Sequence, residues 1–63
     1  MTNYIFILHL RDEKVERVKI AFAEDDDALV TAEYLSEYFD IDVYADYSVI
    51  GVFRRRSARV KRH

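Results

Sequence analysis

The sequence lacks cysteine and contains a single glycine, and these two scarcities exclude several kinds of functional site. Without cysteine, neither a disulfide framework nor a thiolate metal centre can stabilise the chain. Because Gly51 is the only glycine, the chain has no glycine-rich loop for phosphate groups and no nucleophile elbow of the hydrolase type. We therefore expect no cofactor.

Long apolar runs are also missing. The longest one, Tyr4 to Leu8, spans five residues, whereas a membrane-spanning helix needs about 20. This run is too short for a signal peptide, and it lacks the basic start and the small-residue end that signal peptides have. We expect a soluble, cytoplasmic protein that does not contact a membrane.

Charge is divided unevenly along the chain. Residues 1–53 contain all twelve acidic residues but only four basic ones, which gives them a formal charge of −8. The last ten residues, RRRSARVKRH, carry six positive charges and no acid. Such a division predicts either a charged partner or a tail that folds back on its own domain.

The length and the composition predict one small packed domain. The chain has 63 residues, of which 51% are hydrophobic, and it includes five tyrosines and four phenylalanines. This composition is typical of a folded protein. A chain this short buries only about 60% of the surface that its unfolded state exposes, so oligomerisation would add to a small net stability.

The first half of the chain changes from strand periodicity to helix periodicity. Residues 3–10, NYIFILHL, are apolar on both faces, which predicts a central strand. A polar turn at residues 11–14 and alternation in residues 17–22 complete an antiparallel hairpin. Residues 24–39, EDDDALVTAEYLSEYF, then have the period of a helix, whose buried side is expected to carry Ala28, Leu29, Ala32, Leu35 and Phe39.

The start of this helix is strongly acidic. Asp25 or Asp26 is expected to cap the first turn, and acids there interact favourably with the helix dipole. Three consecutive aspartates lack the alternating ligands and the central glycine of a calcium loop, so capping is the interpretation that we prefer over a metal site.

Residues 41–45 and 49–53 predict two further strands around a polar break. Gly51 inside the second strand indicates a β-bulge or a close approach by another element. The order predicts an α+β fold, an antiparallel ββαββ sheet with one amphipathic helix packed on one face. We expect this domain to cover residues 1–53, and residues 54–63 to form a basic, disordered tail.

The opposite face of the predicted sheet has no helix to cover it. Ile5, Ile7 and Ala21, together with Tyr44 or Ile50, are expected on this face. A contiguous apolar patch there marks a partner surface or a dimer surface. We therefore expect a homodimer.

One set of residues carries a resemblance to known proteins. It comprises Tyr4-x-Phe6, Glu16-x-Val18, Ala28 and Ala32 before Leu35, Val43-Tyr44, and Val49-Ile50-Gly51. This layout resembles short uncharacterised bacterial proteins, familiar from alphaproteobacteria, and the resemblance implies a ββαββ fold without any assigned activity. The size and the element order are also similar to those of small phage proteins that block host RNA polymerase, by analogy of layout alone.

His9 and a set of aspartates are the candidates for chemistry. His9 could act as a general base if a carboxylate oriented it and a pocket opened beside it, but a partly buried residue with one hydrogen bond is the simpler interpretation. Asp40, Asp42 and Asp46 could share one strand face, which would suit magnesium or mimic a row of phosphates, or would be a solvated edge-strand face. We predict no catalytic and no metal-binding residues.

The outer side of the helix predicts a binding surface, because tyrosines ringed by acids offer a large contact area at low entropy cost. Scattered exposure of tyrosines is the alternative. The predicted partner-binding residues are Val30, Glu33, Tyr34, Glu37 and Tyr38.

These features favour a non-catalytic protein-interaction module of the inhibitor or regulator type, which binds a macromolecular partner through this acidic, tyrosine-bearing surface or through the sheet. The alternative is a nucleic-acid-binding protein that uses its tail, whose phosphate contacts would make binding strongly salt-dependent. In that case the binding residues are Arg54, Arg55, Arg56, Arg59, Lys61 and Arg62.

Overall fold

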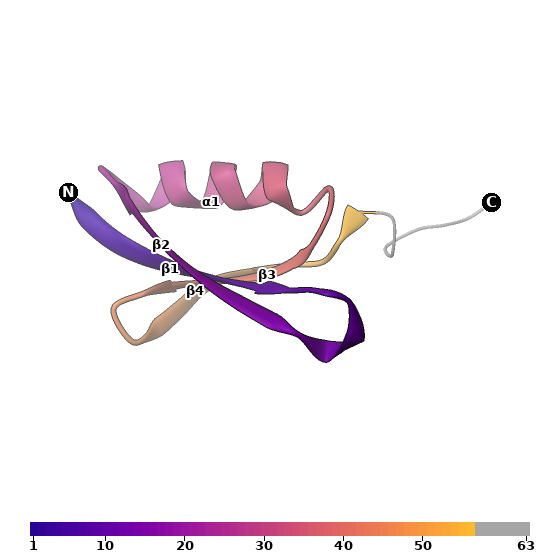
Figure 1. Ribbon diagram of the computed structural model, residues 1–63. Coiled ribbons are helices and arrows are strands. Elements are labelled where there is room, and N and C mark those ends of the chain that lie inside the picture. Colours follow the sequence, from indigo (N-terminus) through magenta and orange to yellow (C-terminus); the bar gives the residue numbers. More distant parts are fainter. Residues whose placement is uncertain (57–63) are drawn as a thin grey trace.

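The computed structural model describes residues 1–56 (Figure 1). Within these residues the chain forms one helix, one short 3-10 turn and four strands. They are β1 (Thr2–His9), η1 (Arg11–Glu13), β2 (Val15–Phe22), α1 (Asp25–Leu35), β3 (Asp40–Ala45) and β4 (Ser48–Phe53). The predicted α+β fold with ββαββ order is confirmed.

The strands of residues 1–56 form one antiparallel sheet in the order β2-β1-β3-β4. β1 lies inside the sheet, where Tyr4 is paired with Ile20 of β2 on one side and with Ala45 of β3 on the other. The inner position of β1 agrees with the sequence of residues 3–10, which is apolar on both faces.

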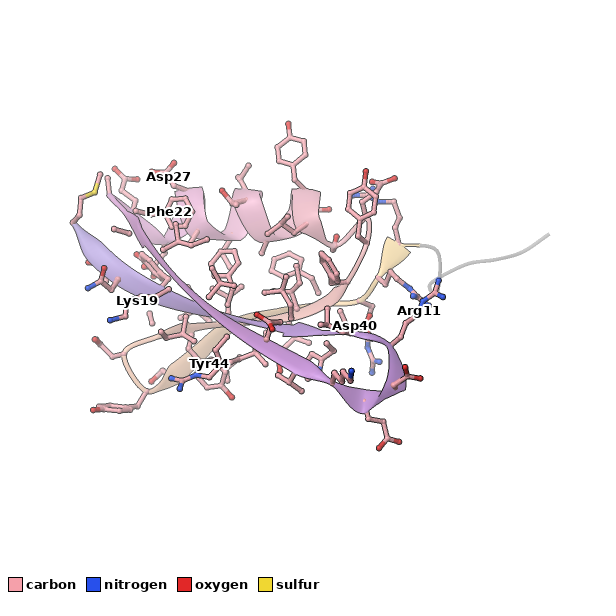
Figure 2. All side chains as sticks on the ribbon, viewed as in Figure 1. Arg11, Lys19, Phe22, Asp27, Asp40 and Tyr44 are labelled. Carbon is pink, nitrogen blue, oxygen red and sulfur yellow. The ribbon has the colours of Figure 1, made fainter. Side chains whose placement is uncertain are left out.

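The hydrophobic core lies between α1 and one face of the sheet (Figure 1). Ala28 and Ala32 are one helical turn apart and fully buried, so the helix backbone lies close to the strands. Phe22 packs on Phe6 with 6.0 Å between the ring centres, on the side of the sheet that faces α1 (Figure 2). The buried apolar side chains are Tyr4, Phe6, Ala28, Ala32, Ile41 and Val43.

The start of α1 differs from the prediction. Glu24 occupies the N-cap position, and no side chain of residues 1–56 caps the helix, so the prediction of a cap at Asp25 or Asp26 is wrong. The Asp25 carboxylate instead accepts a hydrogen bond of 2.6 Å from the Tyr4 hydroxyl. This hydrogen bond, together with burial, raises the pKa of Tyr4 to about 12. The acids of the first turn still lie at the favourable end of the helix dipole.

The end of α1 comes earlier than the periodicity through Phe39 indicates. The helix ends at Leu35, and the backbone N–H groups of Glu37 and Tyr38 donate to carbonyl oxygens three residues back. This tighter winding closes the last turn, and the hydroxyl of the buried Ser36 also donates to the Glu33 carbonyl oxygen at 2.6 Å. Among residues 1–56, no helix has the length and apolarity that crossing a bilayer requires.

Gly51 fulfils both predictions made for it. Val43 is paired with Gly51 but Tyr44 with Val49, so the intervening Ile50 is the extra residue of a β-bulge. A Cβ atom at Gly51 would lie 2.7 Å from Cδ2 of Leu29, so the missing side chain lets α1 approach β4.

The open face of the sheet carries the residues that were expected there. Ile5, Ile7, Ala21 and Tyr44 alternate with core residues along their strands and point away from α1. Of the two alternatives for the last position, Tyr44 lies on this face, and Ile50 packs against the core instead.

The boundary predicted after Phe53 coincides with the end of β4. Three residues of the predicted tail, Arg54 to Arg56, belong to the described part of the chain. The backbone N–H of Arg55 donates a hydrogen bond to the Asp40 carboxylate. Residues 57–63 lie outside the described residues, and with them the predicted binding residues Arg59, Lys61 and Arg62 and most of the predicted disordered tail.

Candidate partner-binding surface

The outer face of α1 exposes two large side chains next to acids. Val30 is 56% exposed and Tyr34 is 75% exposed, because Ala28 and Ala32 direct the other side of the helix toward the sheet. Glu33 lies beside them on α1, and its side chain is also exposed. The helical periodicity that places Ala28 and Ala32 on the buried face of α1 therefore also places these residues on its solvent-exposed face.

An open groove with a volume of about 670 Å³ lies between α1 and the end of β4. Four of its lining residues are apolar or aromatic, and the close approach of α1 to β4 at Gly51 brings the two sets together. Asp26 and Glu33 place negative charge along the same groove. The apolar lining consists of Leu29, Val30, Tyr34 and Phe53.

Arg56 joins the predicted tail to this groove. Its backbone N–H donates a hydrogen bond of 2.7 Å to the Ser36 carbonyl oxygen. Its guanidinium lies with Nε 3.2 Å from Oε1 of Glu37 and with one terminal nitrogen 3.4 Å from the Glu33 carbonyl oxygen. A cation is favourable at the carboxyl end of a helix. Arg56, a residue of the predicted tail, therefore contacts the carboxyl end of α1.

Tyr38 lies outside the groove. It follows the end of α1 and lines a separate hollow of about 430 Å³, where its ring packs edge-to-face against Phe39 with 6.4 Å between centroids. The five predicted binding residues are therefore divided. Val30, Glu33 and Tyr34 line the groove, Glu37 pairs with Arg56, and Tyr38 lies next to the end of the sheet.

Two arginines line the hollow beside Tyr38, one from the predicted tail and one that the sequence analysis did not predict as a binding residue. Arg11 from the β1–β2 turn and Arg55 after β4 both line it. Within the described chain, neither guanidinium has an ion pair. The remaining lining residues are His9, Leu10, Phe39 and Asp40.

His9 forms the single hydrogen bond that was predicted for it. Its Nε2 atom lies 3.0 Å from Oδ2 of Asp42, and the side chain is 42% exposed. A carboxylate and a neighbouring hollow are thus both present. No serine, threonine or cysteine lines either hollow that His9 touches, so the described residues give the pair no such nucleophile to activate.

The three aspartates of the β3 region have separate roles. Asp40 accepts the hydrogen bond from Arg55, Asp42 pairs with His9, and Asp46 lies in the β3–β4 turn with a φ of 58°. Because β4 pairs along its outer side, β3 is an inner strand, and the interpretation as an edge-strand face is wrong. Among residues 1–56, no three histidine, aspartate or glutamate side chains are grouped so that they could hold a metal ion.

Several groove residues could not be assigned from the sequence. The periodicity predicts Leu29 for the core, Asp26 for the helix start and Phe53 for a strand, and none of these predictions points to a shared surface. For these three residues, the sequence feature that bears on the groove is Gly51, because a glycine within a strand indicates close approach by another element.

Comparison with known proteins finds no relative of this chain. No family model, no curated protein and no solved structure matches this chain. The resemblance to short bacterial proteins therefore stays a prediction.

Proposed function

We propose that this chain is a non-catalytic protein-interaction module of the inhibitor or regulator type, and that it binds a partner protein in the α1–β4 groove. The observation that carries the proposal is the combination of apolar side chains with exposed acids in one groove. Leu29 and Phe53 offer apolar contact, and Tyr34 adds a large, rigid and exposed ring. Buried aromatic anchors dominate the binding energy of many protein interfaces.

The charges of the groove favour a partner segment that is both apolar and basic. Asp26 and Glu33 line the groove, and residues 1–53 as a whole carry a charge of −8. Complementary charge speeds encounter and selects against acidic partners. We expect a lysine or arginine of the partner to lie between these two acids. A neighbouring apolar residue of the partner would then pack on Leu29.

The contact of Arg56 supports this choice of partner. Its guanidinium already lies between the Glu37 carboxylate and the Glu33 carbonyl oxygen. The chain itself thus supplies an example of an arginine bound at this surface. A basic residue of the partner would make the same kind of charge-assisted contact further along α1.

Site-specific crosslinking tests the proposal in the host lysate. A photoreactive phenylalanine analogue replaces Tyr34, and the matched control carries it in place of Tyr47, a tyrosine that is 99% exposed and lies in the β3–β4 turn. We expect a nuclease-resistant adduct with a protein other than this chain from position 34 and not from position 47. An equal adduct with such a protein from both positions, or none from position 34, would contradict the assignment of the groove.

A second function, binding of single-stranded nucleic acid, is favoured by one observation. Arg11, Arg55 and Tyr38 line the same hollow, and Tyr38 is 68% exposed. Arg55 of the predicted tail therefore lies beside an aromatic ring, and aromatic stacking next to arginines is how proteins hold unpaired bases. The cytoplasmic location stays a prediction for either function.

Fluorescence anisotropy with labelled oligouridine tests this second function. If it holds, affinity falls with salt with a log-log slope of about −4 for six tail charges on a single strand. Tyr38→Ala then weakens binding about 10-fold, as expected for the loss of one stacked base, whereas Tyr34→Ala in the groove has no effect. A flat salt dependence, or an equal loss in both variants, would remove it.

A further inference from the structure

The open face of the sheet has an ordered arrangement of side chains. The strand register places them in two rows that cross the sheet from β2 to β4. One row consists of Arg17, Ile7, Asp42 and Val52, and the other of Lys19, Ile5, Tyr44 and Val49. Each row thus begins with a cation on β2 and has an isoleucine on β1.

The centre of this face is apolar and has no cover among residues 1–56, since α1 lies on the other side of the sheet (Figure 1). Ile5 and Ile7 remain partly exposed. With Tyr44, which points away from α1 (Figure 2), they line a hollow of about 510 Å³. A contiguous apolar patch of this kind marks an interaction surface.

The charges beside the isoleucines have opposite signs on the two sides of β1. Arg17 and Lys19 lie on β2, and neither has an ion pair with a described residue. Asp42 lies on β3 in the same row as Arg17, with Ile7 between the two residues. Among residues 1–56, its carboxylate bonds only to His9, through Oδ2. Two cations therefore lie on one side of the apolar centre, and Asp42, in the row of Ile7, places a negative charge on the other side.

We propose that this face binds a second copy of the chain around a two-fold axis parallel to β1. Such a rotation exchanges the β2 side with the β3 side and keeps each row opposite itself. Ile5 and Ile7 then pack against the same residues of the second copy, and Arg17 of each copy lies opposite Asp42 of the other. Two sheets packed with aligned strands have the geometry of a β-sandwich.

Self-complementary charge is what selects a second copy as the occupant. In a symmetric dimer every contact occurs twice, so a face with a cation and an anion on opposite sides of an apolar stripe satisfies both charges with itself. A uniformly charged partner, such as a nucleic acid, would meet one sign that repels it. The helices remain on the outer sides, so a dimer presents two α1–β4 grooves to partners.

Sedimentation of the full chain with charge-reversal variants tests the proposal. We expect the wild type to dimerise in a concentration-dependent manner at micromolar concentrations. Arg17→Asp and Asp42→Arg each create two like-charge contacts in the dimer, and each should weaken dimerisation about 100-fold or more. An equimolar mixture of the two variants should form a heterodimer, because both contacts are then between opposite charges.

The control variants carry the same charge changes away from this face. Arg11→Asp in the β1–β2 turn and Glu33→Arg on α1 should leave dimerisation unchanged. A wild type that stays monomeric throughout the concentration range overturns the proposal, whether or not the variants fold. A dimer that tolerates Arg17→Asp, or two folded variants that fail to associate when mixed, shows that another face is used and also overturns it.

Discussion

Leu29 of α1 lies so close to Gly51 of β4 that a Cβ atom on the glycine would come within 2.7 Å of Cδ2 of the leucine. The same Cβ would lie 3.0 Å from the Phe53 ring. Leu29 and Phe53 both line the groove. The absence of one side chain thus determines how α1 meets β4 and how the apolar part of the groove is formed.

Gly51→Ala is therefore expected to destabilise the fold by overpacking. The new methyl group has to displace the end of the Leu29 side chain, and overpacking of this kind costs about 1 to 3 kcal/mol. Urea unfolding measures the change. The double variant Leu29→Ala with Gly51→Ala serves as the control, because the shorter contact, to Leu29, is then gone and the two effects should not add. Strict additivity would show that the contact does not limit packing.

The hydrogen bond between Tyr4 and Asp25 predicts a pH dependence of stability. The pKa of Tyr4 is raised to about 12 from an ordinary value of 10.0, so the folded state binds this proton more tightly than the unfolded state. The contribution is complete below pH 10 and is lost as the pH rises toward 12. The wild type should therefore lose stability over this interval, and Tyr4→Phe should lose less.

Urea unfolding at several pH values between 9 and 12 measures this difference, an interval that brackets the two pKa values. Tyr47→Phe is the matched control, since Tyr47 is 99% exposed and removing its hydroxyl should leave the pH profile of unfolding unchanged. Identical pH profiles for the wild type and Tyr4→Phe would mean that the hydrogen bond to Asp25 does not form in solution.

The ion pair between Arg56 and Glu37 predicts that removal of Arg56 lowers stability only slightly and strengthens partner binding. Both side chains are about half exposed, at 47% and 54%, and such pairs contribute at most about 1 kcal/mol. Arg56→Ala should therefore leave unfolding nearly unchanged. It should strengthen binding of a basic partner a few-fold, because the acids of α1 are freed.

Isothermal titration with the partner recovered by crosslinking measures this change, and Arg11→Ala is the matched control for the loss of an arginine elsewhere. If Arg56→Ala weakens binding instead, then the arginine itself contacts the partner. A chain that ends at Arg54 extends the comparison, since loss of binding with an intact fold would assign recognition to the tail and not to the groove.

Much of the fold follows from local patterns in the sequence. The two apolar faces of residues 3–10 predict an inner strand, the alanines at 28 and 32 predict the buried side of α1, and Gly51 predicts the bulge and the close approach. Each of these features depends on residues that are neighbours in the chain or one period apart.

The features that the sequence did not predict depend on contacts between distant segments. Asp25 is the first residue of α1 and not its cap, and its carboxylate bonds to Tyr4, which is 21 residues away. Phe53 and Arg56 join the groove only because β4 pairs with β3 and its end then passes the carboxyl end of α1. Tyr38 leaves the binding face because α1 ends at Leu35, where tighter turns replace the helical period.

Partner affinity, measured on the double variant Val30→Ala with Tyr34→Ala, bears most directly on the groove. Both residues are exposed, so we expect the free energy of unfolding to change by no more than about 0.5 kcal/mol per site. Affinity for the crosslinked partner should fall about 30-fold or more, the effect of losing an interface tyrosine. The control, Val15→Ala with Tyr47→Ala, removes the same atoms from two exposed positions outside the groove and should bind like the wild type. Unchanged affinity in the groove variant, or an equal loss in the control, would contradict binding through the α1–β4 groove.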